Sequence, residues 1–445
     1  METLSAVKFS ELLQWDIKRL VQTSFSSQMP IVPLGNYIIE QSQKYDISNP
    51  QQDYGILGVN NKIGIFDAYQ ENGSKIHQKY KKMEVGWIAY NPYRVNVGSI
   101  GIKRFEHVFE YISPAYIVFS CAPELLPDYL FLLMKTPSFN KIIRENTTGS
   151  VRQNLSFSVL KQLRIPLPSR SQQDQIVSKY NLSIAEAEAK EAQSEQLESE
   201  IEQYLLGELG VDILTKEEDK HYGLLRIIYH KMLSEWGYDY LSDRNGSILE
   251  SKLYKNVPLH KLMDVNPSTS LSTLKEDEDI SFIPMECVSD IYGELIEQKI
   301  VKSKQSKGYT KFQDGDLIWA KITPCMQNGK SAIVRDLQNG FGCGSTEFHV
   351  LRKSSPEILT EFVYCLLRTR YVLEDAKKYF TGSAGQQRVP KTYLQQLAIP
   401  LPPIDIQNSI VTHIVEMKAQ IKLLKQQAAE LRDKALKDFE NEIFE

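Results

Sequence analysis

Apolar side chains near the end of the chain recur at alternating steps of four and three residues. The pattern holds for more than three heptads through Ile410, Ile414, Met417, Ile421, Leu424, Ala428, Leu431 and Ala435. This spacing is typical of the seam along which one α-helix packs against another in a coiled coil. We therefore predict one long coiled-coil helix over residues 404–445.

A second apolar stripe, less regular than the first, lies in the middle of the chain. It comprises Ile176, Tyr180, Ile184, Ala187, Leu197, Ile201 and Tyr204. Alanine is frequent here, and small residues let two helices approach closely. We expect a long helix over residues 169–210 that pairs with the helix at 404–445, although each could instead pack on its own neighbouring domain. A helix of about 35 residues is roughly 50 Å long, so the pair could act as a ruler along DNA.

Two other parts of the chain, residues 31–168 and 256–403, have a different pattern. Short runs of β-branched and aromatic residues, such as Val85–Tyr90, are broken by Gly, Asn and Pro, which predicts strands and turns. Near its end each part contains one amphipathic stretch, at Leu126–Glu145 and at Glu357–Tyr379, which predicts a helix. We expect two β-rich domains, each with a helical addition.

The second half of the chain repeats landmarks of the first in the same order, at offsets of roughly 225 to 235 residues, which indicates an internal duplication. The matched pairs are Val32-Pro33-Leu34 with Val257-Pro258-Leu259, Thr148-Gly149-Ser150 with Thr381-Gly382-Ser383, Leu163–Pro168 with Leu397–Pro402, and Gln173 with Gln407. Amphipathic stretches at Phe9–Val21 and Leu224–Leu241 also correspond.

The resulting organisation is an N-terminal helical segment (1–30), a first domain (31–168), a first long helix (169–210), a helical connector (211–255), a second domain (256–403) and a second long helix (404–445).

Composition is that of a globular protein, with 42% hydrophobic, 10% aromatic and 24% charged residues among 445. No apolar run approaches the length of a membrane span, and the five cysteines are scattered, so we expect a cytoplasmic protein that is not attached to a membrane and has no zinc site. The net charge of -4 hides an uneven distribution. The first domain carries roughly +4, the second roughly +1, and the first long helix roughly -6.

Motifs for catalysis are incomplete. Asn91-Pro92-Tyr93 resembles an amino-methyltransferase loop that lacks one proline, and no Gly-rich cofactor loop precedes it. Asn328–Ser331 resembles the end of a phosphate-binding loop, but Pro324 stands where the leading glycine would donate its amide. The histidines show no metal-ligand spacing. We predict a non-catalytic chain that binds no cofactor or metal itself.

Basic side chains interleaved with aromatic ones occur at matching places in the two domains, just before a Trp-containing strand. The first run contains Lys75, Lys79, Lys81 and Lys82, and the second contains Lys302, Lys304, Lys307 and Lys311 with Tyr309. Lysines of this kind can bind DNA phosphates. Each run alone could equally be a solvated lysine cluster.

The two Thr-Gly-Ser turns are sharper candidates for DNA contact. Glycine permits close approach of the backbone to a phosphate, and hydroxyl, amide and guanidinium donors follow at once. The donors are Ser150, Arg152 and Gln153 in the first domain and Ser383, Gln386, Gln387 and Arg388 in the second. The same turns could instead be structural loops. Weaker candidates beside the central strands are Arg94, Arg104, Lys321 and Lys330.

The tandem order of these landmarks resembles the specificity subunits of type I restriction-modification enzymes over nearly the whole chain. The resemblance implies an α+β fold in which two β-rich target-recognition domains, related by internal duplication, are spaced by two long helices that form an antiparallel coiled coil. The sequence departs from the pattern at the first long helix, which lacks counterparts of Pro403 and Asp405. This departure leaves the start of that helix open.

What the resemblance implies for function is recognition of a bipartite, asymmetric site in double-stranded DNA, with one half read by each domain. The helices would dock two modification subunits, which carry S-adenosylmethionine and methylate adenine, and motor-nuclease subunits, which use ATP and Mg²⁺ to cleave DNA. Two other functions stay open at this point: a two-domain protein-interaction scaffold without DNA specificity, and a self-contained DNA enzyme.

Overall fold

A computed structural model of the chain divides into two compact units. The first unit is formed within Met1–Glu191 and Gln426–Glu445, and the second within Ala192–Lys425. The structure describes residues 27–61, 63–95, 98–146, 154–212, 248–291, 293–383 and 385–444. The helices predicted at Phe9–Val21 and Leu224–Leu241 lie outside these residues. No helix among the described ranges is both long and apolar enough to cross a lipid bilayer.

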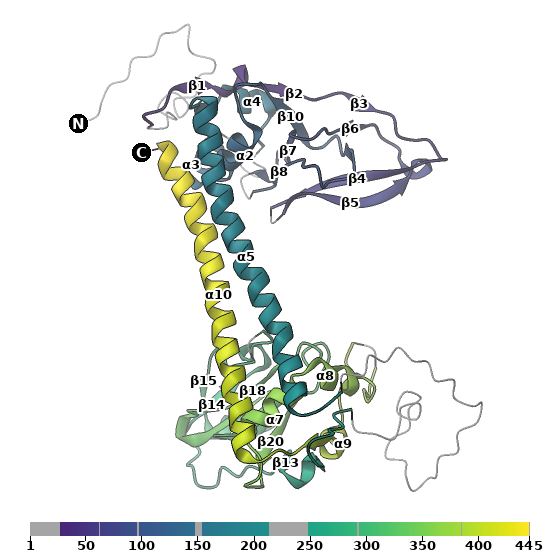
Figure 1. Cartoon of the computed structure of the whole chain (residues 1–445), viewed down its shortest axis with the longest axis vertical. Helices are drawn as coiled ribbons and strands as arrows, with labels where there is room; N and C mark the ends of the chain where they lie inside the picture. The colour runs from purple at the N-terminus through teal and green to yellow at the C-terminus, as the bar shows by residue number, and fades with distance from the viewer. Residues whose placement is uncertain are drawn as a thin grey trace. The chain divides into compact units, whose positions relative to one another are not determined.

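The first unit contains two β-sheets (Figure 1). One is antiparallel with the order β2–β10–β7–β8, formed by Ile38–Glu40, Ile117–Cys121, Ile88–Tyr90 and Ile100–Ile102. The other has the order β3–β6–β9–β4–β5, formed by Lys44–Tyr45, Tyr80–Lys82, Tyr111–Ile112, Asp53–Asn60 and Gly64–Asn72. In this sheet β4 and β9 run parallel. A short pair, β1 (Ile31–Pro33) with β11 (Arg164–Pro166), joins the two ends of the domain.

The second unit repeats this plan except that β3 has no counterpart in it. Its antiparallel sheet has the order β13–β20–β17–β18, formed by Met263–Val265, Phe348–Lys353, Leu317–Ala320 and Ser331–Ile333. Its other sheet has the order β15–β14–β19–β16, formed by Lys299–Lys302, Asp279–Ile283, Phe341–Gly344 and Thr310–Gln313, again with one parallel pair, β14 and β19. The pair β12 (Asn256–Pro258) with β21 (Ala398–Pro400) matches β1 with β11. The predicted duplication of a mixed, β-rich domain is therefore confirmed.

Each helical addition is split where the apolar pattern predicted one helix. In the first unit α2 (Pro127–Lys135) ends before α3 (Pro137–Asn146), and in the second α7 (Thr360–Leu367) ends before α8 (Arg370–Lys377). A threonine stands at each break. The Thr136 hydroxyl accepts the Phe139 amide at 3.2 Å, and the Thr369 hydroxyl accepts the Val372 amide at 3.4 Å. Both bonds start a new helix, and the proline after Thr136 disfavours helical backbone there. A further short helix, α4 (Phe157–Gln162) or α9 (Lys391–Gln396), completes each domain.

The two long helices are α5 (Arg170–Glu208) and α10 (Ile404–Phe444). A buried glutamine near the start of each fixes it to its domain. Gln173 accepts the Leu126 amide at 2.7 Å, and Gln407 accepts the Leu359 amide at 2.9 Å. The amide group of each side chain donates two further bonds to backbone carbonyls. Because the same contacts form in both domains, α5 begins in the expected place without a second proline.

Residue numbers rise along one long helix as they fall along the other, so the helices pair antiparallel in both units. In the first unit Lys179 bonds to Glu442 at 2.8 Å, and Arg432 bonds to Glu191 at 2.6 Å. In the second unit Lys425 bonds to Glu198 at 2.6 Å. The seam of α10 is buried at every predicted position except Leu431, which is half-buried. The seam of α5 is shallower, with Ile176 and Ala187 buried and the other positions half-buried.

Each seam packs on the helix's own domain in one stretch and against the other long helix in another, so both predicted alternatives hold. The first turns of each long helix pack on the helix's own domain, since Ile176 belongs to the first core and Ile410 to the second. The far end of each helix then completes the core of the other repeat. Phe439 and Ile443 of α10 lie in the core of the first unit, and Leu205 and Leu209 of α5 lie in the core of the second unit.

Phe439→Ala should therefore loosen the first domain while leaving the second intact. Emptying a fully packed Phe position costs about 3 to 5 kcal/mol of unfolding free energy, and Phe439 is 2% exposed. We expect faster amide hydrogen exchange in peptides that cover Ile88–Tyr90 and unchanged exchange in those that cover Leu317–Ala320.

Leu205→Ala is the matched control for Phe439→Ala, because Leu205 closes the second core and is 1% exposed. It should produce the reverse pattern of exchange. Equal acceleration in both domains from either variant would contradict the assignment of each helix end to one core.

Candidate nucleic-acid interface

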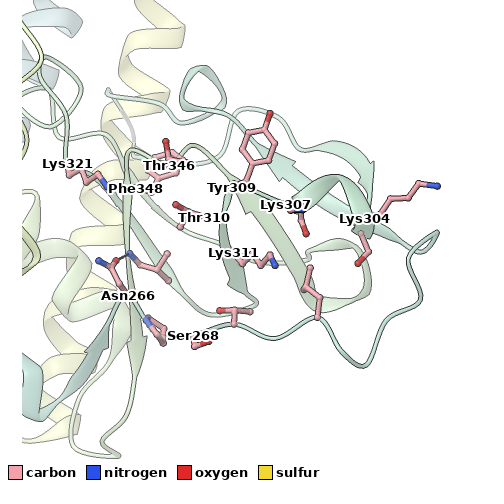
Figure 2. Close-up of a pocket in the computed structure, with 17 residues that line it drawn as sticks. Asn266, Ser268, Lys304, Lys307, Tyr309, Thr310, Lys311, Lys321, Thr346 and Phe348 are labelled. Carbon is pink, nitrogen blue, oxygen red and sulfur yellow. Dashed lines mark hydrogen bonds between the residues drawn. The ribbon is translucent and has the colours of Figure 1, made fainter.

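A groove of about 670 Å³ lies in the second unit, between the loop after β13 and the segment that leads into β16 (Figure 2). Four lysines line it, Lys304, Lys307, Lys311 and Lys321. Hydroxyl side chains stand between them, including Ser268, Thr269, Thr310 and Thr346. Among the described residues no Asp or Glu lines the groove. We call it the lysine groove; its chemistry suits a polyanion with oxygen acceptors.

The floor of the lysine groove is apolar and rigid. Phe348 and Val350 of β20 are 2% and 1% exposed. At one edge Asn266 has a positive φ of 55°, a conformation that asparagine tolerates better than most residues. Its side-chain carbonyl accepts the Val350 amide at 2.9 Å. The groove is therefore shaped by the sheet beneath it.

His349 connects this floor to the loop that follows Thr381. Its Nε2 lies 2.8 Å from the Val389 carbonyl oxygen, and its Nδ1 lies 3.0 Å from the Asn266 amide nitrogen. A neutral ring with hydrogen on Nε2 donates to the first group and accepts from the second. Burial lowers the pKa of His349 to about 4, which keeps the ring neutral at pH 7.

The second Thr-Gly-Ser turn lies beside the lysine groove. Lys321 lines the groove, and its carbonyl accepts the Val389 amide at 2.9 Å. The turn closes on itself through paired backbone bonds between Thr381 and Arg388. Ser383 and Gln386 are exposed, and Gln387 is half-buried. The structure thus joins the turn to the edge of the groove through backbone bonds at Lys321 and Thr323, although no residue of Thr381–Arg388 lines the groove.

Arg388 is already engaged within the protein. Its guanidinium makes two bonds to the Glu347 carboxylate, both of 2.8 Å. This pairing lowers the pKa of Glu347. A fork-to-fork pair is among the stronger surface interactions, so Arg388 holds the turn in place and is less available to a ligand than the sequence suggested.

The remaining second-domain lysines divide by partner. Lys302 bonds to Asp279 at 2.8 Å and Lys304 to Asp277 at 2.6 Å. Lys330 donates to the Met285 carbonyl at 3.3 Å. Within the described chain Lys307, Lys311 and Lys321 have no carboxylate at ion-pair distance, and we call them the free lysines; Glu347, which Arg388 already pairs, interacts with Lys321 only at longer range.

In the first domain most candidate cations are neutralised or buried. Lys75 bonds to Glu71 at 3.4 Å, Lys82 to Glu110 at 3.2 Å and Arg104 to Asp128 at 2.5 Å. Lys79 and Arg94 are exposed. The other candidates of this domain, Ser150, Arg152 and Gln153, lie outside the described residues.

Lys81 differs from the solvent-facing lysine that its sequence context suggested. It is 6% exposed, and its ammonium group donates to the Tyr116 carbonyl at 2.7 Å. Burial lowers the pKa of its ammonium group. The charge of Lys81 is therefore used inside the domain, where it holds the segment after β9.

Sequence reasoning missed the polar residues that line the groove opposite the lysines. Ser268 and Thr269 follow β13, and Thr346 precedes β20, so they meet only in the folded sheet. The only available signal was the Asn266-Pro267 pair after a strand, which marks a turn. In the described part of the chain no cluster of His, Cys, Asp and Glu is suited to hold a metal ion.

The sequence profile of the family described as "Type I restriction modification DNA specificity domain" matches two stretches of the chain, residues 61–199 and 252–433. Together these stretches cover well over half of the chain, and each stretch includes most of one long helix. The match therefore falls once on each repeat.

Two curated relatives from Escherichia coli are each 37% identical to part of the chain. The Type I restriction enzyme EcoEI specificity subunit aligns over 156 residues, which are 35% of this chain and 26% of that protein. The Type I restriction enzyme EcoAI specificity subunit aligns over 171 residues, 38% of this chain and 29% of that protein. The aligned parts are thus less than a third of either relative.

A solved chain is similar over almost the full length. It comes from a structure described as "Structural basis underlying complex assembly and conformational transition of the type I R-M system". The TM-score is 0.58 at 15% identity, with 95% of this chain and 99% of that chain covered. At this identity the likeness concerns the fold.

The buried imidazole makes the second domain sensitive to acid. The pKa of His349 is about 4 in the folded state and near 6.5 when unfolded, so between these values the unfolded chain binds the extra proton. The stability that this residue contributes is complete above pH 6.5 and is lost as the pH falls to about 4. The loss should be about 3 kcal/mol of unfolding free energy.

Comparison of urea unfolding of the native chain and of His349→Gln across this pH range isolates that contribution, because other acidic groups titrate in both proteins. The difference between the two should shrink as the pH falls. A difference that does not change between pH 7 and pH 4 would show that His349 is not held neutral.

Proposed function

Because this chain belongs to the type I restriction modification DNA specificity family, we propose that it selects the DNA sequence on which a type I restriction-modification complex acts. The observation that carries the proposal is that the family profile matches both repeats of the chain. The lysine groove supports it, since free cations, hydroxyl donors and the absence of lining carboxylates among the described residues suit the DNA backbone.

We propose that the two domains read two different halves of an asymmetric site. Apart from the additional strand β3 in the first domain, the matching strands of the two domains have the same order and pairing, so they offer equivalent frames. The side chains at the candidate surfaces differ in charge and in partner. Equivalent frames with different side chains present different donors and acceptors to base edges, which is what direct recognition of two unlike half-sites requires.

The helix pair would set the spacing between the half-sites and dock the modification and motor-nuclease subunits. Exposed apolar side chains on the long helices support a docking role: Leu182 of α5 is 73% exposed, and Val415 and Leu423 of α10 are 58% and 53% exposed. In this proposal S-adenosylmethionine, ATP and Mg²⁺ belong to those partners, and the chain itself is non-catalytic.

DNA binding with a steep dependence on salt is the first expected result. A protein that neutralises several phosphates loses affinity linearly on logarithmic axes as salt rises, with a slope of about 0.9 for each phosphate contact. Electrophoretic shifts of a mixed-sequence duplex with the native chain, alone and with its modification subunits, should show this slope. Negligible binding in both cases would favour the alternative of a protein-interaction scaffold.

Lengthening the helix pair should lengthen the DNA spacer. Glu191–Arg432 in the first unit and Glu198–Lys425 in the second are ion pairs one heptad apart in sequence on each helix. Duplicating that heptad in both α5 and α10 adds about 10 Å of helix, close to three base pairs of DNA.

Methylation mapping of cells that carry the lengthened chain should show the same half-sites with a longer spacer. Duplicating the heptad in α5 alone is the control, because the partner seam then falls out of register and methylation should be lost. An unchanged spacer with both insertions would refute the ruler.

A further inference from the structure

We propose that the lysine groove of the second domain holds the DNA backbone and supplies most of the salt-dependent affinity, whereas the corresponding surface of the first domain contributes little. The inference rests on the proposed DNA-binding function and concerns how the two domains divide it. It predicts two domains that are alike in fold but differ in the free positive charge that they present to the DNA backbone.

A shared turn allows the two surfaces to be compared position by position. Gly86 has a φ of 84° and donates its amide to Lys103, and Gly315 has a φ of 85° and donates its amide to Val334. Each turn leads into the strand at the centre of its antiparallel sheet, β7 or β17. Gly86 and Gly315 are therefore equivalent positions.

Aligning the chain on this turn shows what replaces the three free lysines. Gln78 stands at the position of Lys307, and Pro92 stands at the position of Lys321. Neither replacement carries a charge. The third free lysine, Lys311, has a lysine as its counterpart, namely Lys82.

The strand ladders explain why Lys82 and Lys311 differ in available charge. Lys82 lies opposite Tyr111 of β9, and Lys311 lies opposite Cys343 of β19. The residue before Tyr111 is Glu110, which bonds to Lys82 at 3.2 Å. The residue before Cys343 is Gly342, which has no side chain to offer. One position thus carries a neutralised lysine in the first domain and a free one in the second.

Free and paired lysines differ in what they contribute to DNA binding. A free lysine that reaches a phosphate releases the counterions condensed there, which is the main source of non-specific affinity. A lysine with a carboxylate beside it brings that negative charge to the phosphate as well, so its net attraction is small. The second domain therefore dominates the salt dependence.

The test compares three triple variants of the full-length chain, each of which removes three positive charges. They are K307A/K311A/K321A in the lysine groove, K75A/K79A/K82A in the first domain, and K255A/K261A/K353A at exposed lysines of the second unit outside the groove. Fluorescence anisotropy with a mixed-sequence DNA duplex, measured from about 50 to 200 mM salt, gives the slope for each protein. Thermal unfolding verifies that each variant remains folded.

We expect the groove variant to lower the slope by about two to three, and each of the other two to lower it by less than about one. A reduction as large in the first-domain variant, or a groove variant no different from the exposed-lysine control, would overturn the inference while leaving DNA binding established. Absence of binding by the native chain, both alone and with its modification subunits, would instead remove the proposed function.

Discussion

Neither domain of this chain is complete until the far end of a long helix enters its core. Phe439 and Ile443 close the first core although the whole second domain precedes them in sequence, and Leu205 and Leu209 close the second. These contacts must offset the entropy lost when a long loop of chain is closed, so the stability of the first domain depends on residues of the last helix. The helix pair is therefore part of both cores as well as a connection between them, and its register is fixed where it enters each one.

The features predictable from sequence were those that obey a local period or recur in both halves of the chain. The heptads of α10 and the β-rich character of both domains follow from side-chain spacing. The repeated glutamines stood out in the sequence only as a matched pair, and the structure supplies their role: Gln173 and Gln407 are buried, and a buried amide needs every bond that it makes. Each closes three contacts to backbone groups that precede or begin its helix.

The features that the sequence did not reveal depend on partners far along the chain. The apolar pattern ran through Thr136 and Thr369 without a break, because side-chain periodicity does not register a hydroxyl that caps a new helix. The lysine groove is assembled from separate segments around β13, β16 and β20, so its polar wall had no contiguous signature. Lys81 looked like its neighbours, yet its strand position turns it inward to the Tyr116 carbonyl.

Whether a lysine carries free charge therefore depends less on its position in the sequence than on the residue next to its partner in the strand ladder. Lys82 and Lys311 occupy equivalent positions, and the difference between Glu110 and Gly342 decides whether the charge is free. Glu110 is exposed just before β9, whereas Gly342 is buried in β19, where any side chain would meet the ring of Phe312. The free charge of Lys311 is thus tied to the packing of the second domain, because the buried Phe312 ring leaves no room for a side chain at position 342. Two domains of one fold can in this way present different charge at the same strand position, because that position is packed differently in each of them.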